Sequence, residues 1–357
     1  MAPLLASLVG DPDVAALFEP AAEIGALLRF EATLAAAQAT CGVIADGVAE
    51  RIALACEKLT SDETVLQGGL AQDGVVIPAL LRELRKTTGD ASDKVHLGAT
   101  SQDVIDSGLI LRMRAVLTLL DERIALVLDE IERHEGQAGA YPLMAQTRMQ
   151  AALPFTVASK LGTWKRPLES HRERIAALSS TLPIQLGGPV GDGTSFGPKY
   201  ELIRAETARR LDLRDTSPWH SDRSIILDIG QVLALLAGTL GKLGQDVALM
   251  AQSKVRAVEL TSGGGSSAMT HKTNPVGAEI LVALGRFAAG LMGTLSQAMI
   301  HENERSGAAW TLEWMVLPQL AESTGAATSH AAALLAQMRF GTRHGSTASD
   351  PADQLSE

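Results

Sequence analysis

The chain has 357 residues, 46% of them hydrophobic and 20% charged, a composition typical of a soluble protein long enough to bury a large core. Only 3% of the residues are aromatic, which favours helices packed through small and aliphatic side chains over β-sandwiches. The formal net charge of -10 makes the surface repel nucleic acid and anionic membranes. We therefore expect no nucleic-acid partner, and a locally basic pocket for any anionic substrate.

The sequence also predicts a cytoplasmic location. The two cysteines, Cys41 and Cys56, have no metal-ligand spacing and are interpreted as reduced thiols, which are typical of a reducing compartment. The N-terminus lacks the basic region of a signal peptide, and the longest apolar stretch, 229–241, is interrupted by Gln231. We expect no export, no membrane span and no metal site.

Residues 1–95 are predicted to form a separate region of short helices. One of these helices contains Arg29, Phe30 and Glu31, and the pair Asp73-Gly74 interrupts the pattern.

A long helix is predicted next. Apolar residues recur at steps of three and four over 105–131, with Thr100 and Ser101 as capping candidates before them and Gly136 as the end of the helix.

Four further helices complete a predicted bundle, because the same spacing recurs over 155–178, 226–250, 276–295 and 312–338. Helices of this length cannot form a compact sphere. We therefore expect an elongated all-α bundle over residues 96–340 that buries its remaining apolar surface by forming a homo-oligomer. Residues 341–357, rich in Ser, Thr, Asp and Gly, are predicted to form a flexible tail.

Three polar segments interrupt these helices, and the first is HLGATSQD (96–103). Its Thr100 and Ser101 can cap the following helix, with Asp103 in the first turn. The segment has more hydrogen-bonding side chains than a cap requires, however, and the N–H groups of a helix N-terminus also bind anions. A carboxylate site is the chemical alternative.

The second segment, QTRMQ (146–150), lies between Pro142 and Pro154 and is predicted to form a constrained loop or a short turn into the next helix. A lone arginine in a loop is usually solvated. Contact of Arg148 with a substrate is the alternative.

The third segment, GGGSSAMTHKTNP (263–275), has the densest set of specific residues. Its three glycines allow a loop that closes over a ligand, and Pro275 fixes where the next helix begins. A surface loop capped by Asn274 is the alternative.

The third segment resembles the signature loop G-S-S-x-M-x-x-K-x-N-P of the fumarase/aspartase superfamily. The Thr-Ser-Gln-Asp and Gln-Thr-x-x-Gln segments resemble the other two regions of that superfamily, in the expected order, and the resemblance covers roughly residues 10–335. It implies a bundle of long helices with a small helical N-terminal region. The chain is shorter than typical members, so a shortened C-terminal domain is expected.

Within the superfamily, PWHSDR (218–223), the segment 96–103 and GAAW (307–310) ahead of Glu313-Trp314 resemble the 3-carboxy-cis,cis-muconate cycloisomerases. The superfamily's lyases usually carry a histidine as general acid in the segment that matches 146–150, where this chain has Arg148. That departure disfavours a lyase that releases fumarate. The resemblance implies lactonisation of a tricarboxylate in protocatechuate catabolism, without a cofactor, in a homotetramer with shared active sites.

The resemblance also implies roles for individual residues. Ser266 is the candidate for proton transfer at carbon, while Lys272 and Asn274 stabilise the negative charge of an aci-carboxylate-like state. His96 is either a donor to the substrate or a support for another group. The remaining substrate-binding candidates are Thr100, Ser101, Gln102, Thr147, Arg148, Gln150, His220, Arg223, Ser267 and Met269. His271 and Arg305 are weaker candidates.

Two other functions stay open from the sequence. One is a carbon–nitrogen lyase that releases fumarate, such as an adenylosuccinate-type lyase, and Arg148 is the feature against it. The other is a non-catalytic helical oligomer, although packing does not need Ser266, Lys272 and Asn274.

Overall fold

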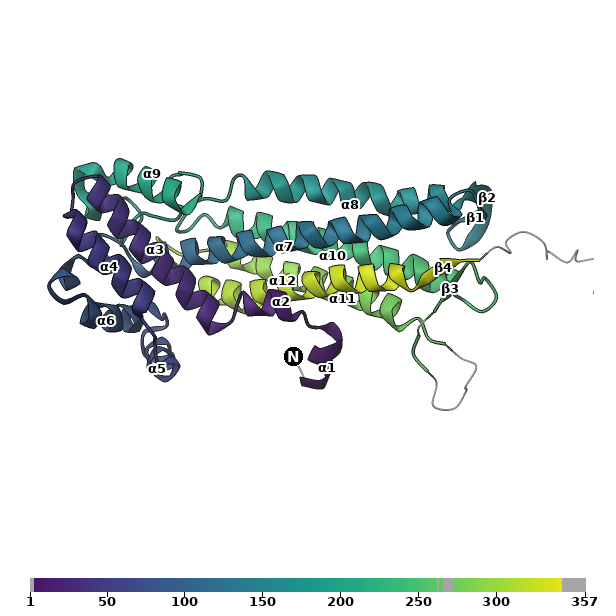
Figure 1. Cartoon of the computed structure of the whole chain (residues 1–357), viewed down its shortest axis with the longest axis horizontal. Helices are drawn as coiled ribbons and strands as arrows, with labels where there is room; N and C mark the ends of the chain where they lie inside the picture. The colour runs from purple at the N-terminus through teal and green to yellow at the C-terminus, as the bar shows by residue number, and fades with distance from the viewer. Residues whose placement is uncertain (1–2, 262, 266–272, 342–357) are drawn as a thin grey trace, which may run out of the picture.

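The computed structural model describes residues 3–261, 263–265 and 273–341, and they form a long rod of helices (Figure 1). The α-helices are α1 Pro3–Val9, α2 Pro12–Ala16, α3 Pro20–Thr40, α4 Asp46–Lys58, α5 Glu63–Asp73, α6 Ile77–Thr88, α7 Ser101–Ala138, α8 Val157–Ser179, α9 Tyr200–Leu211, α10 Ser224–Met250, α11 Val276–Leu295 and α12 Gly307–Ala336. Short 3₁₀ helices are η1 Gly89–Lys94, η2 Thr194–Lys199 and η3 Ser296–Met299. The predicted all-α class is confirmed.

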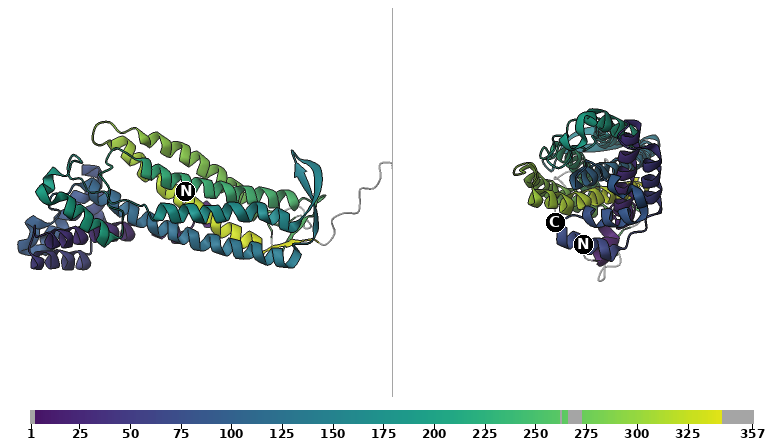
Figure 2. Two further views of the ribbon diagram at one scale, coloured as in Figure 1. Left: turned by 90° about the horizontal axis from the view of Figure 1, so that it is seen from above. Right: turned by 90° about the vertical axis from the view of Figure 1, so that its left-hand side faces the viewer.

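Five long helices, α7, α8, α10, α11 and α12, run along the rod (Figures 1 and 2). The apolar positions of α10 show why they pack together, because Ile229, Leu233, Leu236 and Leu240 recur at three- and four-residue steps and are fully buried. Gly241 allows close approach to α11, whose Leu281 oxygen lies 3.2 Å from the position of a Cβ atom there.

Most helix boundaries lie within two residues of the spacing, but α12 begins at Gly307, five residues before the start expected at 312. The long helix after Thr100 does not end at Gly136 but continues to Ala138, with Gly139 as its C-cap. Phe155 belongs to a strand rather than to α8, and Met338 likewise begins a strand. The spacing marks a buried helical stripe, and it does not report where an apolar run changes to strand geometry.

The shorter helices α3 to α6 gather with α9 at one end of the rod (Figures 1 and 2). The predicted break at Asp73-Gly74 is confirmed, since α5 ends at Asp73 and Gly74 adopts a left-handed φ of 70°. Phe30 is fully buried on α3.

Two small antiparallel sheets lie at the opposite end of the rod (Figure 1). One is a hairpin of β1, Pro142–Thr147, with β2, Gln150–Thr156. The other pairs β3, Val258–Leu260, with β4, Met338–Phe340. The sequence did not predict either sheet.

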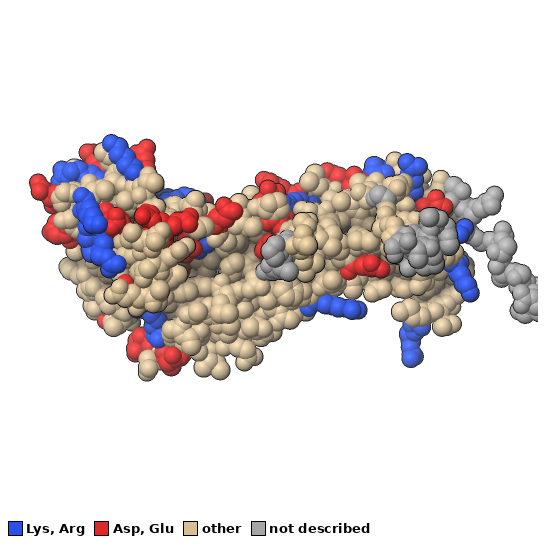
Figure 3. Space-filling model, turned by 90° about the horizontal axis from the view of Figure 1, so that it is seen from below, with Lys and Arg blue, Asp and Glu red and all other residues tan. Residues whose placement is uncertain are grey.

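Apolar surface remains exposed along the rod. Within the described residues, α10 and the segment Val276–Met299 are long and apolar enough to span a membrane, yet both are components of the bundle, with α10 packed against α11 and α12. Figure 3 shows wide areas of one face without charged side chains. Exposed large apolar residues on α10, α11, η3 and the following segments include Leu235, Phe287, Met299, Ile300 and Met315.

Candidate active site

The predicted site residues fall into two groups at opposite ends of the rod. The segment around Thr100 lies where α7 begins, whereas the hairpin that carries Arg148 lies beyond the end of α7 (Figure 1). Helix α7 has 38 residues, which corresponds to roughly 57 Å at 1.5 Å per residue. Asn274, at the end of the glycine-rich segment, also lies at the hairpin end. One chain therefore does not bring the two groups together.

Thr100 is the N-cap of α7 and, like Ser101, is partly exposed. The buried Asp103 turns back to this N-terminus, where its Oδ2 atom accepts hydrogen bonds from the backbone N–H groups of Thr100 at 3.0 Å and Gly188 at 2.9 Å. Its Oδ1 atom accepts from the N–H of Gly187 at 2.8 Å. Asp103 thus ties the glycine-rich segment 187–193 to the start of α7.

Gln102 is fully buried and does not face an open cavity. Its amide nitrogen donates to the His220 carbonyl at 2.8 Å and to Asp106 at 3.1 Å, while its amide oxygen accepts from Arg305 Nε at 2.8 Å. The prediction that Gln102 binds the substrate therefore needs correction. Gln102 positions Arg305.

Arg305, a weaker candidate from the sequence, lies beside Thr100 and Gln102. Its Nη2 atom lies 3.4 Å from Thr100 Oγ1 and 3.3 Å from the Pro189 carbonyl oxygen, and the side chain remains partly exposed. Among the described residues no carboxylate pairs with it, so its charge is free to meet an anion. The segment 300–306 gave no periodic signal, and only the folded chain shows that it meets Thr100.

Arg223 has a different role from the predicted one. It is 2% exposed, and its guanidinium donates to Glu313 at 2.8 and 2.6 Å and to Asp106 at 2.7 and 3.1 Å. Trp310 Nε1 also donates to Asp106 at 2.9 Å, and the Arg223 guanidinium lies over the Trp219 ring. Because two carboxylates already hold it, Arg223 fixes the interior of this end and is not available for a substrate carboxylate.

Two carboxylates around one arginine leave an excess of buried negative charge. Burial raises the pKa of Glu313 above its usual range, although the hydrogen bond and charge of Arg223 oppose that shift. His301 lies beside this group, with Nε2 3.7 Å from Glu313 Oε1 and a side chain that is 0% exposed. Burial and the Arg223 charge lower the pKa of His301.

His220 and His96 lie at the same end but differ in their surroundings. His220 is 5% exposed, with Nε2 3.3 Å from Asp103 Oδ1 and a buried Nδ1 to which none of the described residues is hydrogen-bonded. His96 is partly exposed, and its Nδ1 lies 2.6 Å from Glu31 Oε1. Both histidines remain candidates for contact with a substrate.

The hairpin end is more open. Thr147 pairs with Gln150 across the turn, and Arg148 and Met149 form that turn with left-handed φ values of 50° and 66°. These residues and Gln146 are all exposed. The predicted loop or turn into a helix is therefore the tip of a β-hairpin, which presents Arg148 to the outside of the chain.

The third segment closes at its base. The Gly264 N–H donates to the Asn274 carbonyl at 3.0 Å, and the Asn274 N–H donates back at 2.9 Å. The backbone at Gly264 has no room for a side chain, since a Cβ atom would lie 2.5 Å from Val276 Cγ2. The predicted residues Ser266, Ser267, Met269 and Lys272 lie outside the described residues.

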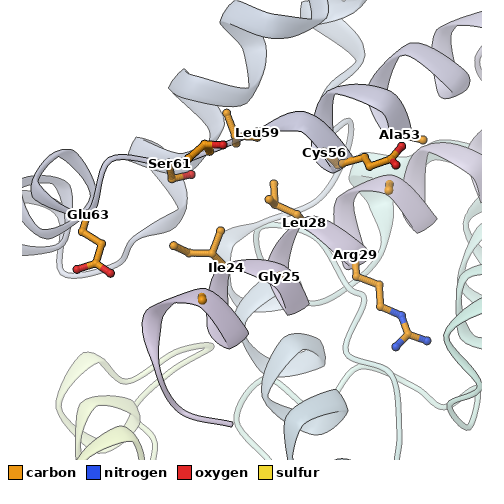
Figure 4. A pocket seen from close by; sticks show the side chains of 13 residues that line it. Ile24, Gly25, Leu28, Arg29, Ala53, Cys56, Leu59, Ser61 and Glu63 are labelled. Atoms are coloured by element: carbon orange, nitrogen blue, oxygen red, sulfur yellow. The ribbon is translucent and has the colours of Figure 1, made fainter. Parts of the chain in front are cut away.

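Two cavities lie in different parts of the rod. A cavity of ≈ 810 Å³ at the hairpin end is lined by Gln146, Met149 and Phe155 together with the end of α10. Lys160 and Asp246 form a 2.8 Å ion pair in its wall. The second, of ≈ 580 Å³, lies among α3, α4 and the segment before α5, with Leu28 and Cys56 in its lining (Figure 4). None of the predicted site residues lines it.

No group of three or more His, Cys, Asp or Glu side chains suited to a metal ion occurs in the part of the chain that the structure describes.

Comparison with known proteins decides the family. The sequence profile of the lyase family matches residues 18–290. A 3-carboxy-cis,cis-muconate cycloisomerase of Pseudomonas aeruginosa is 38% identical over 333 residues, which cover 90% of this chain and 72% of that protein. The chain belongs to the fumarase/aspartase superfamily of lyases.

Solved structures of the superfamily share the fold. The 3-carboxy-cis,cis-muconate lactonizing enzyme of Pseudomonas putida superposes with a TM-score of 0.88 at 32% identity and covers 95% of this chain and 77% of that one. A fumarate lyase of Mesorhizobium sp. BNC1 gives a TM-score of 0.87 at 27% identity and covers 93% and 76%. The superfamily fold is thus present over nearly all of this chain.

Proposed function

We propose that the chain is a 3-carboxy-cis,cis-muconate cycloisomerase. Four relatives with that activity are 34–38% identical over 87% or more of this chain. The observation that carries the proposal is the convergence of the segments that resemble this subgroup. The segment 218–223 supplies Trp219 and Arg223, and the segment 307–314 supplies Trp310 and Glu313. Together they form a single buried group behind Thr100.

The reaction is an isomerisation in which one carboxylate of the substrate adds to a carbon–carbon double bond. A C–O bond forms, the π electrons move toward the carbon next to another carboxylate, and this carbon takes up one proton. The difficult state is an aci-carboxylate with two negative charges. Preorganised hydrogen-bond donors and cations stabilise such a state by about 3–4 kcal/mol each.

The roles of the residues follow from charge and position. Arg305, Thr100 and the N-terminus of α7 supply donors for substrate carboxylates at one end of the rod. Arg148, Thr147 and Gln150 supply donors at the other. We propose Ser266 as the residue that transfers the proton at carbon, with Lys272 and Asn274 stabilising the developing charge. No step requires a cofactor.

The two ends meet only if several chains combine. We propose a homotetramer in which the Thr100 end of one subunit completes a site with the hairpin and the glycine-rich segment of others. The separation along α7 supports this arrangement. So does the exposed apolar surface, because only 28% of the most apolar window in Val276–Met299 is buried within one chain.

A complementation experiment tests the shared site. Ser266→Ala should be nearly inactive, and Arg305→Met should show little activity at substrate concentrations well below its raised KM, since each substitution changes one end. When both are co-expressed, hybrid oligomers contain sites in which neither substitution is present, so activity should partly return. If purified co-expressed protein stays as inactive as the two single variants, each site is built within one chain. Light scattering gives the oligomer size in the same samples.

The direct test of the function uses purified protein and 3-carboxy-cis,cis-muconate without added metal. Loss of the conjugated-diene absorbance, with a lactone as the product, is the expected result. Absence of that change, with fumarate released from adenylosuccinate, would favour the carbon–nitrogen lyase instead. We place the reaction in the cytoplasm, in keeping with the free thiols of Cys41 and Cys56.

A further inference from the structure

A buried carboxylate–imidazole pair lies just before α7. His96 Nδ1 is 2.6 Å from Glu31 Oε1, and the two side chains are 11% and 1% exposed. Glu31 lies on α3, 65 residues earlier in the chain, so tertiary packing alone brings the pair together. Nothing in the proposed reaction so far uses Glu31.

Packing does not explain why a carboxylate occupies this position. Glu31 Oε2 is buried and has no hydrogen-bond partner within the described part of the chain, which is an unfavourable environment for a carboxylate oxygen. The loop that follows is already anchored to α3 by Gln38, whose amide nitrogen donates to the Leu97 carbonyl at 2.7 Å. An apolar residue at position 31 would leave that anchor intact, so Glu31 serves His96 itself.

The pair leaves one edge of the imidazole ring available. With Nδ1 directed to Glu31, the opposite nitrogen, Nε2, has no hydrogen-bond partner among the described residues, and the ring keeps some exposure. The His96 backbone adopts a left-handed φ of 64°, and its carbonyl accepts from the Ala99 N–H at 3.2 Å. This tight turn holds His96 directly ahead of Thr100, the N-cap of α7.

We propose that Glu31 is a positioning residue that fixes His96 so that its Nε2–H donates a hydrogen bond to a substrate carboxylate beside the N-terminus of α7. In this arrangement Nδ1–H donates to Glu31 and Nε2–H to the substrate, so the ring carries one N–H toward each carboxylate. Glu31 acts through His96 and does not touch the substrate. The inference rests on the proposed function for the identity of that tricarboxylate.

A double-mutant cycle tests the pair. The variants are Glu31→Gln, His96→Gln and the double variant, and the measurements are KM, kcat and calorimetric binding of propane-1,2,3-tricarboxylate, a trianion that cannot react. Loss of a charge-assisted hydrogen bond should raise KM and Kd about tenfold in Glu31→Gln, with little change in kcat. The double variant should bind the tricarboxylate no more weakly than His96→Gln alone, because Glu31 has no effect on binding without the imidazole ring. Glu31→Asp should recover part of the binding.

Gln38→Leu is the matched control, since it removes a buried hydrogen bond from α3 to the same loop without touching His96. It should lower the midpoint of thermal unfolding, and its effect on binding should add to that of His96→Gln. Unchanged binding in Glu31→Gln, additive effects of Glu31→Gln and His96→Gln, or no tricarboxylate binding by the unaltered protein would each overturn the proposal. Coupled effects on binding without any turnover of 3-carboxy-cis,cis-muconate would instead refute only the proposed function.

Discussion

The two ends of the rod are built in different ways. Around Thr100, carboxylates and cations are buried and paired, as in the contacts of Arg223 with Asp106 and Glu313. At the hairpin, Thr147, Arg148 and Gln150 are exposed, and the backbone ladder is the main support. One end is therefore preorganised within the chain, whereas the other acquires its surroundings from neighbouring subunits in the proposed oligomer. Substitutions in the buried group around Arg223 should accordingly affect stability, whereas substitutions at the hairpin and in the glycine-rich segment should affect catalysis.

The largest effect is expected at the glycine-rich segment. Ser266→Ala should lower kcat by about 10²–10⁴-fold, the usual contribution of a proton-transfer residue, because the hydroxyl that transfers the proton is lost. The midpoint of urea unfolding should not move. Steady-state kinetics and urea titration measure the two effects, and substantial residual turnover would remove Ser266 from the mechanism.

Arg223→Met should destabilise the chain more than any of the other substitutions. It leaves the buried Asp106 and Glu313 without a cation, which typically lowers the free energy of unfolding by roughly 3–5 kcal/mol. Chemical denaturation measures the change. The control is Arg172→Met, which breaks the more exposed pair with Asp121 and should change stability by less than about 1 kcal/mol. Equal effects of the two substitutions would contradict a preorganised interior.

Arg305→Met should act on binding at the otherwise buried end. Removing one cation from a substrate carboxylate should raise KM about 10- to 100-fold, with a small effect on unfolding because the side chain is partly exposed. Arg305→Lys keeps the charge but loses the contact with Gln102. Its KM should therefore lie between those of the unaltered protein and Arg305→Met. A normal KM in Arg305→Met would show that Arg305 only ties the loop to Gln102 and Thr100.

The smallest effect is expected at the hairpin tip. Arg148→Ala should raise KM by a few fold to about tenfold, without a change in the unfolding of the isolated chain, because this side chain is exposed there. Kinetics and thermal unfolding at several protein concentrations check this. A lower unfolding midpoint that depends on protein concentration would place Arg148 in a subunit contact instead of the site.

Sequence spacing predicted the helices well where one face is buried along the whole length, as in α10 and α11. It missed the hairpin of β1 with β2, because both strands are largely exposed and have no alternation of apolar and polar residues. The roles of Gln102 and Arg223 were not predictable from local sequence. Asp106 lies 117 residues from Arg223 along the chain, and Glu313 lies 90 residues from it. A motif shows which residues are present and does not show which of them fold against each other.

The buried group around Arg223 also imposes an order on synthesis. Asp106, Arg223 and Glu313 enter the chain in that sequence, so the last carboxylate becomes available only when α12 has been made. Until then, Arg223 has one of its two acidic partners, and the Trp310 contact to Asp106 is missing as well. We expect the Thr100 end to remain incompletely packed on the ribosome until α12 emerges, and a nascent chain that stops before Glu313 to be a substrate for chaperones and proteases.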